Sequence, residues 1–199
     1  HSFIMSFAKE ADLTKRDLEG KDLLQMSLKY RDELKWDNTE ITELYAFVSY
    51  ACSFPKSVIA LVDSYSTINS GVKNFLCVAL ALDDLGHKAV GVRLDSGDLG
   101  KLSLEIKEMY KEVGIKYNRD LSYLKVVASN DINEEVLNNL NTHGHSIDIY
   151  GIGTNLVTCQ AQPALGMVYK LVSINGEPRI KLSEELEKTT LPGAKAVAR

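Results

Sequence analysis

The stretch VGVRLDSGDLGKLS, residues 90 to 103, decides how the rest of the chain is interpreted. It begins as a short apolar strand, continues through an arginine, two aspartates and a glycine, and then begins a helix. In parallel α/β proteins, ligand sites collect at the carboxyl ends of the strands. We therefore expect Arg93 and Asp95 to face a site, and Asp98 to cap the helix that follows.

The same strand-then-helix pattern recurs on both sides of this stretch. Apolar runs with polar carboxyl ends alternate with amphipathic or apolar segments at intervals of roughly 30 residues, which predicts a parallel α/β fold with right-handed crossovers. Four such units amount to half of a TIM-like barrel. We expect strands in 57–63, 88–95, 123–131 and 146–153, and helices in 42–54, 72–86, 98–114 and 132–144.

The two ends of the chain differ from this central pattern. Residues 10–40 are highly charged with scattered leucines, which predicts a surface helix interrupted near Gly20. Residues 167–183 form two alternating runs around NGEP, a β-hairpin signal, and we expect this hairpin to leave the barrel. Because the chain begins without methionine and ends without an evident terminal cap, we expect a piece of a longer protein.

Composition narrows the class of protein. The chain has 199 residues, 45 % hydrophobic, with a net charge of -4, so it can bury one sizeable core but offers no basic surface for nucleic acid. It contains no apolar run long enough to span a membrane and no signal-peptide pattern. Three widely spaced cysteines, Cys52, Cys77 and Cys159, are expected to be buried free thiols. We expect a cytoplasmic protein.

All four predicted strand ends carry polar or small residues. Each end has a simple structural explanation, since Asp98 or Asp131 could merely cap a helix and an arginine beside an aspartate could be only an ion pair. Together they favour a site for a polar, phosphorylated ligand, with glycine backbone N–H groups for a phosphate and carboxylates for ribose hydroxyls or a metal-bound phosphate. The residues are Asp63, Ser64, Tyr65, Arg93, Asp95, Ser96, Gly97, Asp98, Ser129, Asn130, Asp131, Gly151, Gly153 and Thr154.

Several motifs in a fixed order resemble the nicotinate phosphoribosyltransferase family. They are HSFIMSF, LVDSYS, AVGVRLDSGDL, VASNDINEE, YGIGTNLVTC and the closing KLSEELEKTTLPGAKAVAR, so the resemblance covers essentially the whole chain. It implies a type II phosphoribosyltransferase fold, an irregular α/β barrel, and a homodimer. The implied reaction joins nicotinate to 5-phosphoribosyl 1-diphosphate, giving nicotinate mononucleotide and diphosphate in NAD synthesis, with Mg²⁺ and with ATP hydrolysis coupled through a phosphohistidine.

The resemblance also implies roles for individual residues. His1 matches the phosphorylated histidine and Asp63 the carboxylate that orients it. Arg93 matches the arginine at the nicotinate and phosphate side, and Asp95 the carboxylate near the reacting ribose and base. The ribose-contacting loop matches Ser129, Asn130 and Asp131, and the 5-phosphate loop matches Gly151, Gly153 and Thr154; the metal ligands remain unknown.

The resemblance suggests three parts of the chain. Residues 1–55 would carry the catalytic histidine and a helical connection, 56–160 the βα units of the barrel, and 161–199 the hairpin and tail. The sister enzyme that uses nicotinamide has proline in place of Leu94 and a more glycine-rich phosphate loop, so RLDSGD and GIGT favour nicotinate.

Three alternatives stay open, one of which is the nicotinamide-using sister enzyme. The chain could be a non-catalytic fragment or binding module, because the N-terminal part that supplies base-stacking aromatics in the family is absent; we expect the isolated chain to be inactive and poorly stable. It could instead belong to another phosphate-binding barrel enzyme, such as an aldolase or decarboxylase, although no predicted strand end carries the lysine that a Schiff base needs.

Overall fold

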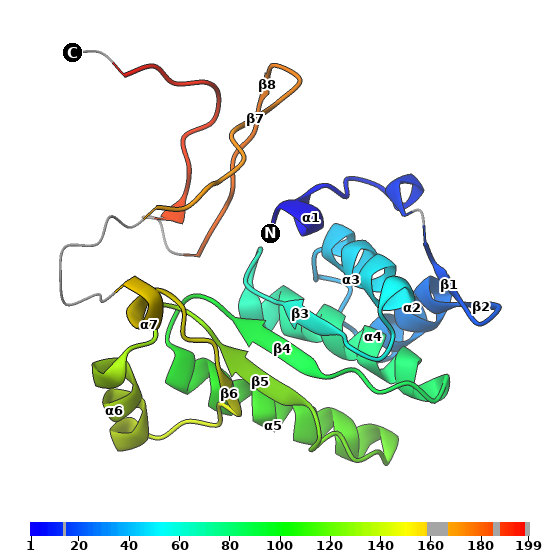
Figure 1. The fold of residues 1–199 in the computed structure, drawn as a ribbon. Helices are drawn as coiled ribbons and strands as arrows, with labels where there is room; N and C mark the ends of the chain where they lie inside the picture. Colours follow the sequence, from blue (N-terminus) through cyan, green and yellow to red (C-terminus); the bar gives the residue numbers. More distant parts are fainter. Residues whose placement is uncertain (14, 159–166, 185–187, 198–199) are drawn as a thin grey trace.

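A computed structural model describes residues 1–13, 15–158, 167–184 and 188–197. A four-stranded sheet lies at the centre, with helices on one side of it and a hairpin standing above its carboxyl ends (Figure 1). The helical segments are α1 (Ser2–Met5), η1 (Glu10–Asp12), α2 (Leu23–Glu33), α3 (Ile41–Ser53), the π-helical turn η2 (Thr67–Gly71), α4 (Val72–Asp84), α5 (Leu99–Tyr117), α6 (Glu134–His143) and α7 (Thr154–Thr158). The strands are β1 (Asp17–Leu18), β2 (Lys21–Asp22), β3 (Ile59–Leu61), β4 (Gly91–Leu94), β5 (Lys125–Ala128), β6 (Ile149–Tyr150), β7 (Ser173–Ile174) and β8 (Glu177–Pro178).

The central sheet is parallel throughout, in the order β3-β4-β5-β6, which confirms the predicted α/β class and the four strands. Successive side chains of a strand point to opposite faces. One face is buried under helices and includes Ala60, Val92 and Val126. On the other face Ile59 and Ile149 are exposed, so this face is left partly uncovered by the described chain.

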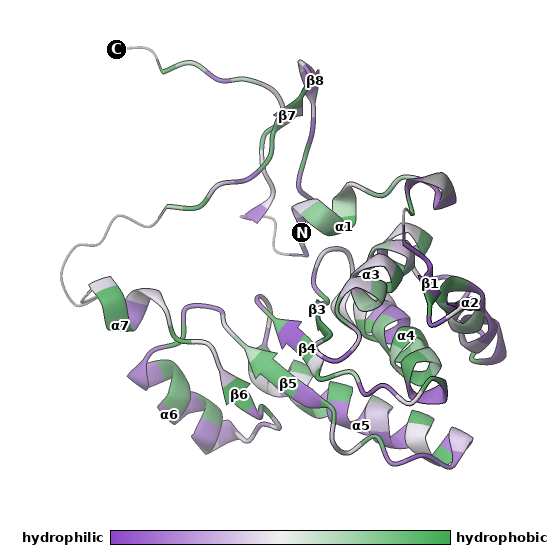
Figure 2. Cartoon of the chain, turned by 45° about the vertical axis from the view of Figure 1, so that its right-hand side comes forward, coloured by the Kyte–Doolittle hydropathy of each residue, from purple (hydrophilic) through white to green (hydrophobic). Residues whose placement is uncertain are grey.

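The helix with the most buried residues in the described chain, α4, lies in the middle of the core (Figure 2). Ten of its residues, between Val72 and Leu82, are buried. The helix packs against α2 and α3, and it lies beneath the sheet in Figure 1. A helix that is apolar on all sides is stable in water only when it is covered on all sides. The predicted helix 72–86 is therefore confirmed, and it joins the N-terminal helices to the sheet.

Gly71 allows α4 to begin directly against the end of β3. A Cβ atom at this position would lie 2.1 Å from the backbone oxygen of Val62, far inside van der Waals contact. Only glycine permits this approach, since it has no Cβ. The close contact fixes where the loop from Asp63 to Ser66 turns at the edge of the sheet.

One predicted helix boundary is wrong. We expected α5 to end at Gly114, but the helix continues to Tyr117 and ends at Asn118, which takes the left-handed conformation with φ 51°. Gly114 lies inside the helix, and a Cβ there would meet the backbone oxygen of Arg119 at 2.7 Å. The glycine thus serves close packing rather than termination, and the asparagine ends the helix.

The remaining sequence expectations are largely confirmed. The charged N-terminal region holds η1, the short β1–β2 ribbon around Gly20, and α2. The predicted hairpin is present as β7 and β8, which are shorter than expected and are joined by Asn175-Gly176, both at positive φ. Cys77 is a buried free thiol and Cys52 a half-buried one, whereas Cys159 lies outside the described residues.

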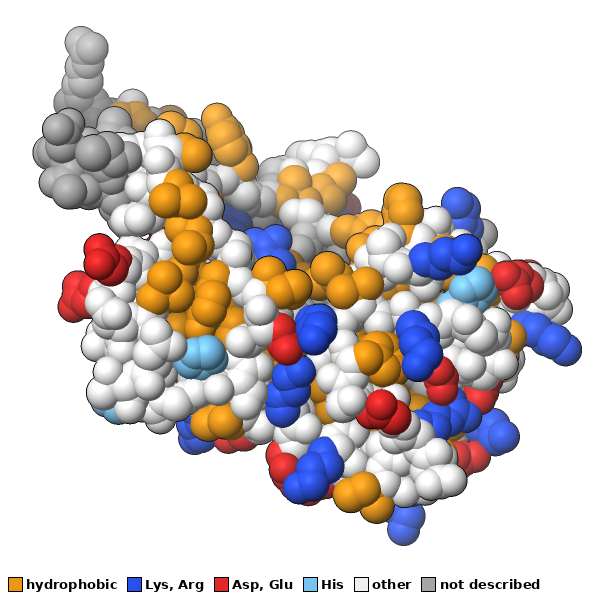
Figure 3. Space-filling model, turned by 60° about the horizontal axis from the view of Figure 1, so that its bottom comes forward, with side chains coloured by type: hydrophobic (Ala, Val, Ile, Leu, Met, Phe, Trp, Pro, Cys, Tyr) orange, Lys and Arg blue, Asp and Glu red, His pale blue; other side chains and the backbone are white. Residues whose placement is uncertain are grey.

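The lower face of the molecule carries interspersed positive and negative side chains, with hydrophobic side chains gathered at one side (Figure 3). Oppositely charged side chains also pair along α5, as Lys101 does with Glu105 and Lys111 with Glu108. No helix in the described part of the chain is both long enough and apolar enough to cross a membrane.

Candidate functional site

The carboxyl ends of the four parallel strands meet at one edge of the sheet, and the predicted site residues lie there. They form two clusters. The first joins the N-terminal segment to the ends of β3 and β4, and the second joins the ends of β4, β5 and β6.

The first cluster is centred on the buried carboxylate of Asp63, which is only 3 % exposed. His1 points both ring nitrogens towards this strand end: Nδ1 lies 2.9 Å from Oγ of Ser64, and Nε2 lies 3.5 Å from Oδ1 of Asp63. Ser96 donates a hydrogen bond of 2.6 Å to the other oxygen of Asp63. The structure thus brings together His1 and Asp63 as the sequence suggested, and fixes the carboxylate from a neighbouring strand.

The second cluster is a hydrogen-bonded triangle across β4 and β5. Arg93 donates from Nε to Oγ of Ser129 at 2.7 Å, and Ser129 donates to Oδ1 of Asp95 at 3.0 Å. The Arg93 guanidinium also lies 3.4 Å from the same Asp95 oxygen. Because the Arg93 side chain is still 46 % exposed, its remaining N–H groups are accessible to a ligand carboxylate or phosphate.

A small cavity of about 100 Å³ adjoins this triangle at the end of β6. Its lining includes Ser129, Asp131, Gly151, Gly153 and Thr154, all predicted site residues. The backbone at Gly153 faces open space, with no atom within 4 Å of a Cβ built there. The cavity is therefore accessible to a small anion that approaches the backbone closely.

The two aspartates that we considered as helix caps behave differently. Asp98 caps α5, accepting a hydrogen bond of 3.0 Å from the backbone N–H of Lys101. Asp131 does not cap α6; Asn133 does, accepting from Val136 N at 2.9 Å. Asp131 is exposed, with φ 47°, which leaves its carboxylate available at the rim of the small cavity.

Sequence reasoning missed the lysines that reach the site from the C-terminal tail. Lys188 Nζ lies 3.5 Å from both the backbone oxygen of Asp95 and Oδ1 of Asn130. Lys181 is buried, and its charge interacts with Asp63. The sequence analysis considered lysines on the predicted strands, whereas Lys188 comes from the tail, which returns to the sheet. Only the motif match in KLSEELEKTT could have indicated this.

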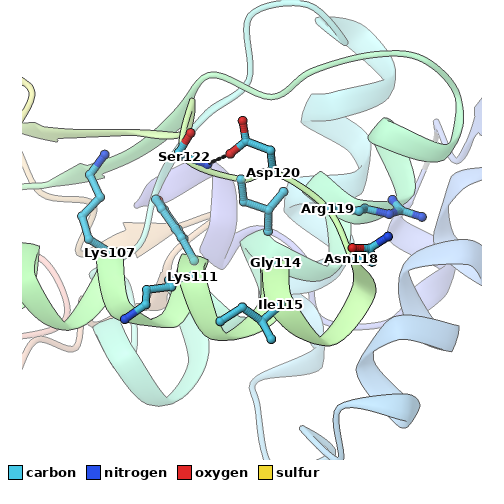
Figure 4. A pocket seen from close by; sticks show the side chains of 10 residues that line it. Lys107, Lys111, Gly114, Ile115, Asn118, Arg119, Asp120 and Ser122 are labelled. Carbon is cyan, nitrogen blue, oxygen red and sulfur yellow. Dashed lines mark hydrogen bonds between the residues drawn. The ribbon is translucent and has the colours of Figure 1, made fainter.

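A larger groove, about 630 Å³, lies at the opposite end of the sheet between α5 and the loop before β5 (Figure 4). Its basic residues are engaged within the protein. Lys107 bonds to the Leu124 carbonyl oxygen and Asp148, and Arg119 bonds to Leu80 O, Asp83 and Asp84. These contacts tie α5 to the sheet and to α4, so the groove is a structural joint rather than a charged binding site.

The described residues include no group of three or more His, Cys, Asp or Glu side chains suited to hold a metal ion. Asp95 and Asp131 nevertheless offer carboxylate oxygens near the strand ends, the donor type that Mg²⁺ takes together with substrate phosphates.

A parallel α/β sheet with an arginine–carboxylate triangle and a glycine-lined cavity at its strand ends offers the kinds of groups that bind phosphorylated ligands in α/β proteins. The comparison with known families is more specific. Residues 73–199 match the nicotinate phosphoribosyltransferase (NAPRTase) family, and the chain belongs to that family.

Relatives and solved structures agree with this assignment. The chain is 55 % identical over 205 residues to nicotinate phosphoribosyltransferase of Dictyostelium discoideum and 46 % identical over 211 residues to that of Caenorhabditis elegans, covering 100 % and 98 % of this chain. The crystal structure of human nicotinic acid phosphoribosyltransferase matches with a TM-score of 0.67 and 35 % identity over 98 % of this chain. The chain spans only 35 % and 38 % of the two relatives and 38 % of the human chain.

Proposed function

We propose that this chain is the strand-end portion of a nicotinate phosphoribosyltransferase, which forms nicotinate mononucleotide and diphosphate from nicotinate and 5-phosphoribosyl 1-diphosphate. One observation supports the proposal above the others. Ser96, on the loop after β4, bonds to Asp63 at the end of β3, so the His1–Asp63 pair and the Arg93–Asp95–Ser129 triangle lie at neighbouring strand ends. A histidine nucleophile and a phosphorylated-sugar site are thereby adjacent, as ATP-coupled phosphoribosyl transfer requires.

The first half of the proposed reaction is phosphorylation of His1 by ATP. A lone pair on the imidazole forms a P–N bond to the γ-phosphorus, while the P–O bond to ADP breaks and its electron pair leaves on ADP. The positive charge left on the ring is balanced by Asp63, which lies on the Nε2 side of the ring. Ser96 holds that carboxylate in place through its 2.6 Å bond.

The second half is transfer of the phosphoribosyl group to the ring nitrogen of nicotinate. The guanidinium of Arg93 would bind the nicotinate carboxylate through parallel N–H bonds. The bond from the anomeric carbon to diphosphate breaks as the bond to nicotinate forms, which builds positive charge on the ribose. Asp95 lies where its negative charge would stabilise that charge, and Gly151, Gly153 and Thr154 line the cavity for the 5-phosphate.

Asp95 and Asp131 would hold Mg²⁺ jointly with the substrate's diphosphate, with Asn130 and Ser129 left for ribose hydroxyls. Bound Mg²⁺ supplies charge neutralisation of the leaving diphosphate.

The remaining parts of the proposal concern the whole protein. Part of one sheet face is uncovered, and the outer edges of β3 and β6 pair with no other strand in the described residues. Both features fit an α/β barrel that further strands complete, with residues 1–55 and the hairpin and tail from 161 onwards outside its βα units. The boundary at 160–161 falls outside the described residues. We also propose a cytoplasmic homodimer that acts in NAD synthesis.

The test is an assay of the full-length protein containing this chain. It is supplied with nicotinate or nicotinamide, phosphoribosyl diphosphate and Mg²⁺, with and without ATP, and the mononucleotide is identified. We expect nicotinate mononucleotide, more of it with ATP, and its loss in Arg93→Ala. Product from nicotinamide instead would assign the sister activity, and no product from either base would favour a non-catalytic binding role.

A further inference from the structure

The π-helical turn η2 directly follows the loop of residues 63–66, which carries Asp63 at the end of β3. Helical turns of this kind are rare and are frequently found at functional sites. The backbone oxygen of Ser66 accepts hydrogen bonds of 2.9 Å from both Ser70 N and Gly71 N. The position of η2 therefore fixes where the loop that carries Asp63 ends.

Gly71 couples η2 to the sheet at the other end of this loop. Because a Cβ atom at Gly71 would lie 2.1 Å from the backbone oxygen of Val62, there is no room between η2 and the residue that precedes Asp63. Close-packed interiors transmit a shift of one element to its neighbours. A displacement of η2 would therefore also move the strand end that carries Asp63.

Ser70 holds η2 against the start of α3, the helix that lies beside α4 in Figures 1 and 2. Its hydroxyl donates a hydrogen bond of 2.6 Å to Oε2 of Glu43 and accepts one of 3.0 Å from the backbone N–H of Glu40. Asn74, in the first turn of α4, donates to the same Glu43 oxygen at 3.1 Å and to the Glu40 backbone oxygen at 2.8 Å. Glu43 is thus the side chain at which α3, η2 and α4 are joined.

A carboxyl group at this place calls for an explanation, since Glu43 is 0 % exposed and the same helix buries apolar residues such as Leu44 and Phe47. Burial of a carboxyl group costs free energy, and well-packed apolar side chains often stabilise a core equally well. A buried hydrogen-bond network instead holds its members in one arrangement. Asp63 lies near enough for its charge to contribute to the raised pKa of Glu43. The acid is therefore better suited to fixing the position of η2 than to adding cohesion to the core.

We propose that Glu43 is a positioning residue for the phosphorylation of His1. It holds Ser70 and η2 against α3, and it thereby keeps the Asp63 carboxylate at the place where Ser96 bonds to it and where it faces the imidazole. The catalytic part of this inference rests on the proposed function, because it assumes that His1 accepts the phosphoryl group. Glu43 is fully buried, so it contacts no ligand and acts only through the loop.

The experiment uses the full-length protein that contains this chain, with Glu43→Leu, Glu43→Gln and the control Val113→Ala. Val113 is buried near the far end of α5, so its truncation lowers stability through the core rather than through the Glu43 network. Acid-labile phosphate from labelled ATP measures phosphorylation of His1, and steady-state kinetics give the KM for nicotinate. Crystal structures of the variants give the distance from Asp63 Oδ2 to Ser96 Oγ, which is 2.6 Å here.

We expect Glu43→Leu to slow phosphorylation about tenfold, the usual effect of losing a hydrogen bond to a carboxyl group, and to lengthen the Asp63–Ser96 distance beyond hydrogen-bond range. The KM for nicotinate should not change, because Arg93 belongs to the other cluster of the site. Glu43→Gln should restore both the rate and the distance, since an amide oxygen accepts from the same two donors. Val113→Ala should lose stability but keep the wild-type rate.

Two results would overturn the inference. One is a wild-type rate or an unchanged distance in a folded Glu43→Leu protein. The other is an equal loss of rate in Glu43→Leu, Glu43→Gln and Val113→Ala, which would show only a loss of stability. If Glu43→Leu does not fold, Ser70→Ala removes the same link while the carboxyl group stays in place, and the same two measurements decide. A wild-type protein that takes no phosphate on His1 would refute the proposed function, whereas the distance measured in the variant crystals would still decide whether Glu43 holds the loop.

Discussion

The hydroxyl of Ser96 donates a hydrogen bond of 2.6 Å to Oδ2 of Asp63, so a side chain from the loop after β4 holds the carboxylate at the end of β3. Both residues are buried, at 4 % and 3 % exposed. The other Asp63 oxygen has no hydrogen-bond partner in the described chain and faces the His1 ring. Ser96 is therefore placed to orient the carboxylate without contacting a ligand itself.

Replacing Ser96 with alanine should reduce phosphorylation of His1 about tenfold, because Asp63 loses the bond that aligns it, while stability falls by about 1.5–3 kcal/mol because a buried carboxylate loses a hydrogen bond. Acid-labile phosphate on the protein and the melting temperature measure the two effects. Ser53→Ala is the matched control, since its hydroxyl bonds only to the Ser49 carbonyl oxygen in α3. Equal phosphorylation in Ser96→Ala and the wild type would show that Asp63 needs no such support.

Ser129 orients Arg93 in the same way that Ser96 orients Asp63. Its hydroxyl accepts from Arg93 Nε and donates to Asp95, so it fixes the plane of the guanidinium. Ser129→Ala should raise the KM for nicotinate about tenfold with a smaller fall in kcat, because the arginine binds the base less well but is still present. Ser129→Thr keeps the hydroxyl and should recover most of the affinity. A fall in kcat alone would contradict this role.

Glu43 is a buried acid outside the proposed site. It is 0 % exposed on α3, and its Oε2 accepts bonds from Ser70 at 2.6 Å and Asn74 at 3.1 Å. Burial raises the pKa of Glu43 to about 7, despite those two bonds, with the charges of Glu40 and Asp63 adding to the rise. Its Oε1 has no hydrogen-bond partner among the described residues.

This pKa makes stability depend on pH in a defined direction. Below about pH 4.5 the Glu43 carboxyl is protonated in both the folded and the unfolded chain. Its contribution to the free energy of unfolding is therefore fully present there. Between about pH 4.5 and 7 the unfolded chain has lost the proton and the folded chain keeps it, so stability falls with rising pH, by up to roughly 3 kcal/mol. Glu43→Gln should remove this component. Melting temperatures from pH 5 to 8 test it, and parallel curves for wild type and variant would contradict it.

The strands and their polar ends could be predicted from the alternating pattern because both are local properties. The role of Asp98 as the N-cap of α5 could also be predicted, because it directly precedes a segment with apolar residues at helical spacing. The end of α5 could not be predicted, because the glycine at 114 serves the close approach of the Arg119 backbone oxygen, a tertiary contact, and does not end the helix. Lys181 could not be predicted from the residues alone either, since no periodicity says that a tail over 100 residues away from β3 returns to Asp63.

Substitution by alanine should have different effects at two glycines, because a Cβ atom would meet the backbone at Gly71 and open space at Gly153. In Gly71→Ala the new Cβ would lie 2.1 Å from the Val62 backbone oxygen, so α4 must shift away from β3, at a cost of about 1–3 kcal/mol. In Gly153→Ala the Cβ enters open space, so the melting temperature should hold while the KM for phosphoribosyl diphosphate rises, because the methyl group narrows the cavity of about 100 Å³. Thermal melts and steady-state kinetics on both variants separate the effects. If Gly153→Ala bound phosphoribosyl diphosphate as tightly as the wild type, the 5-phosphate would have to lie elsewhere along the strand ends.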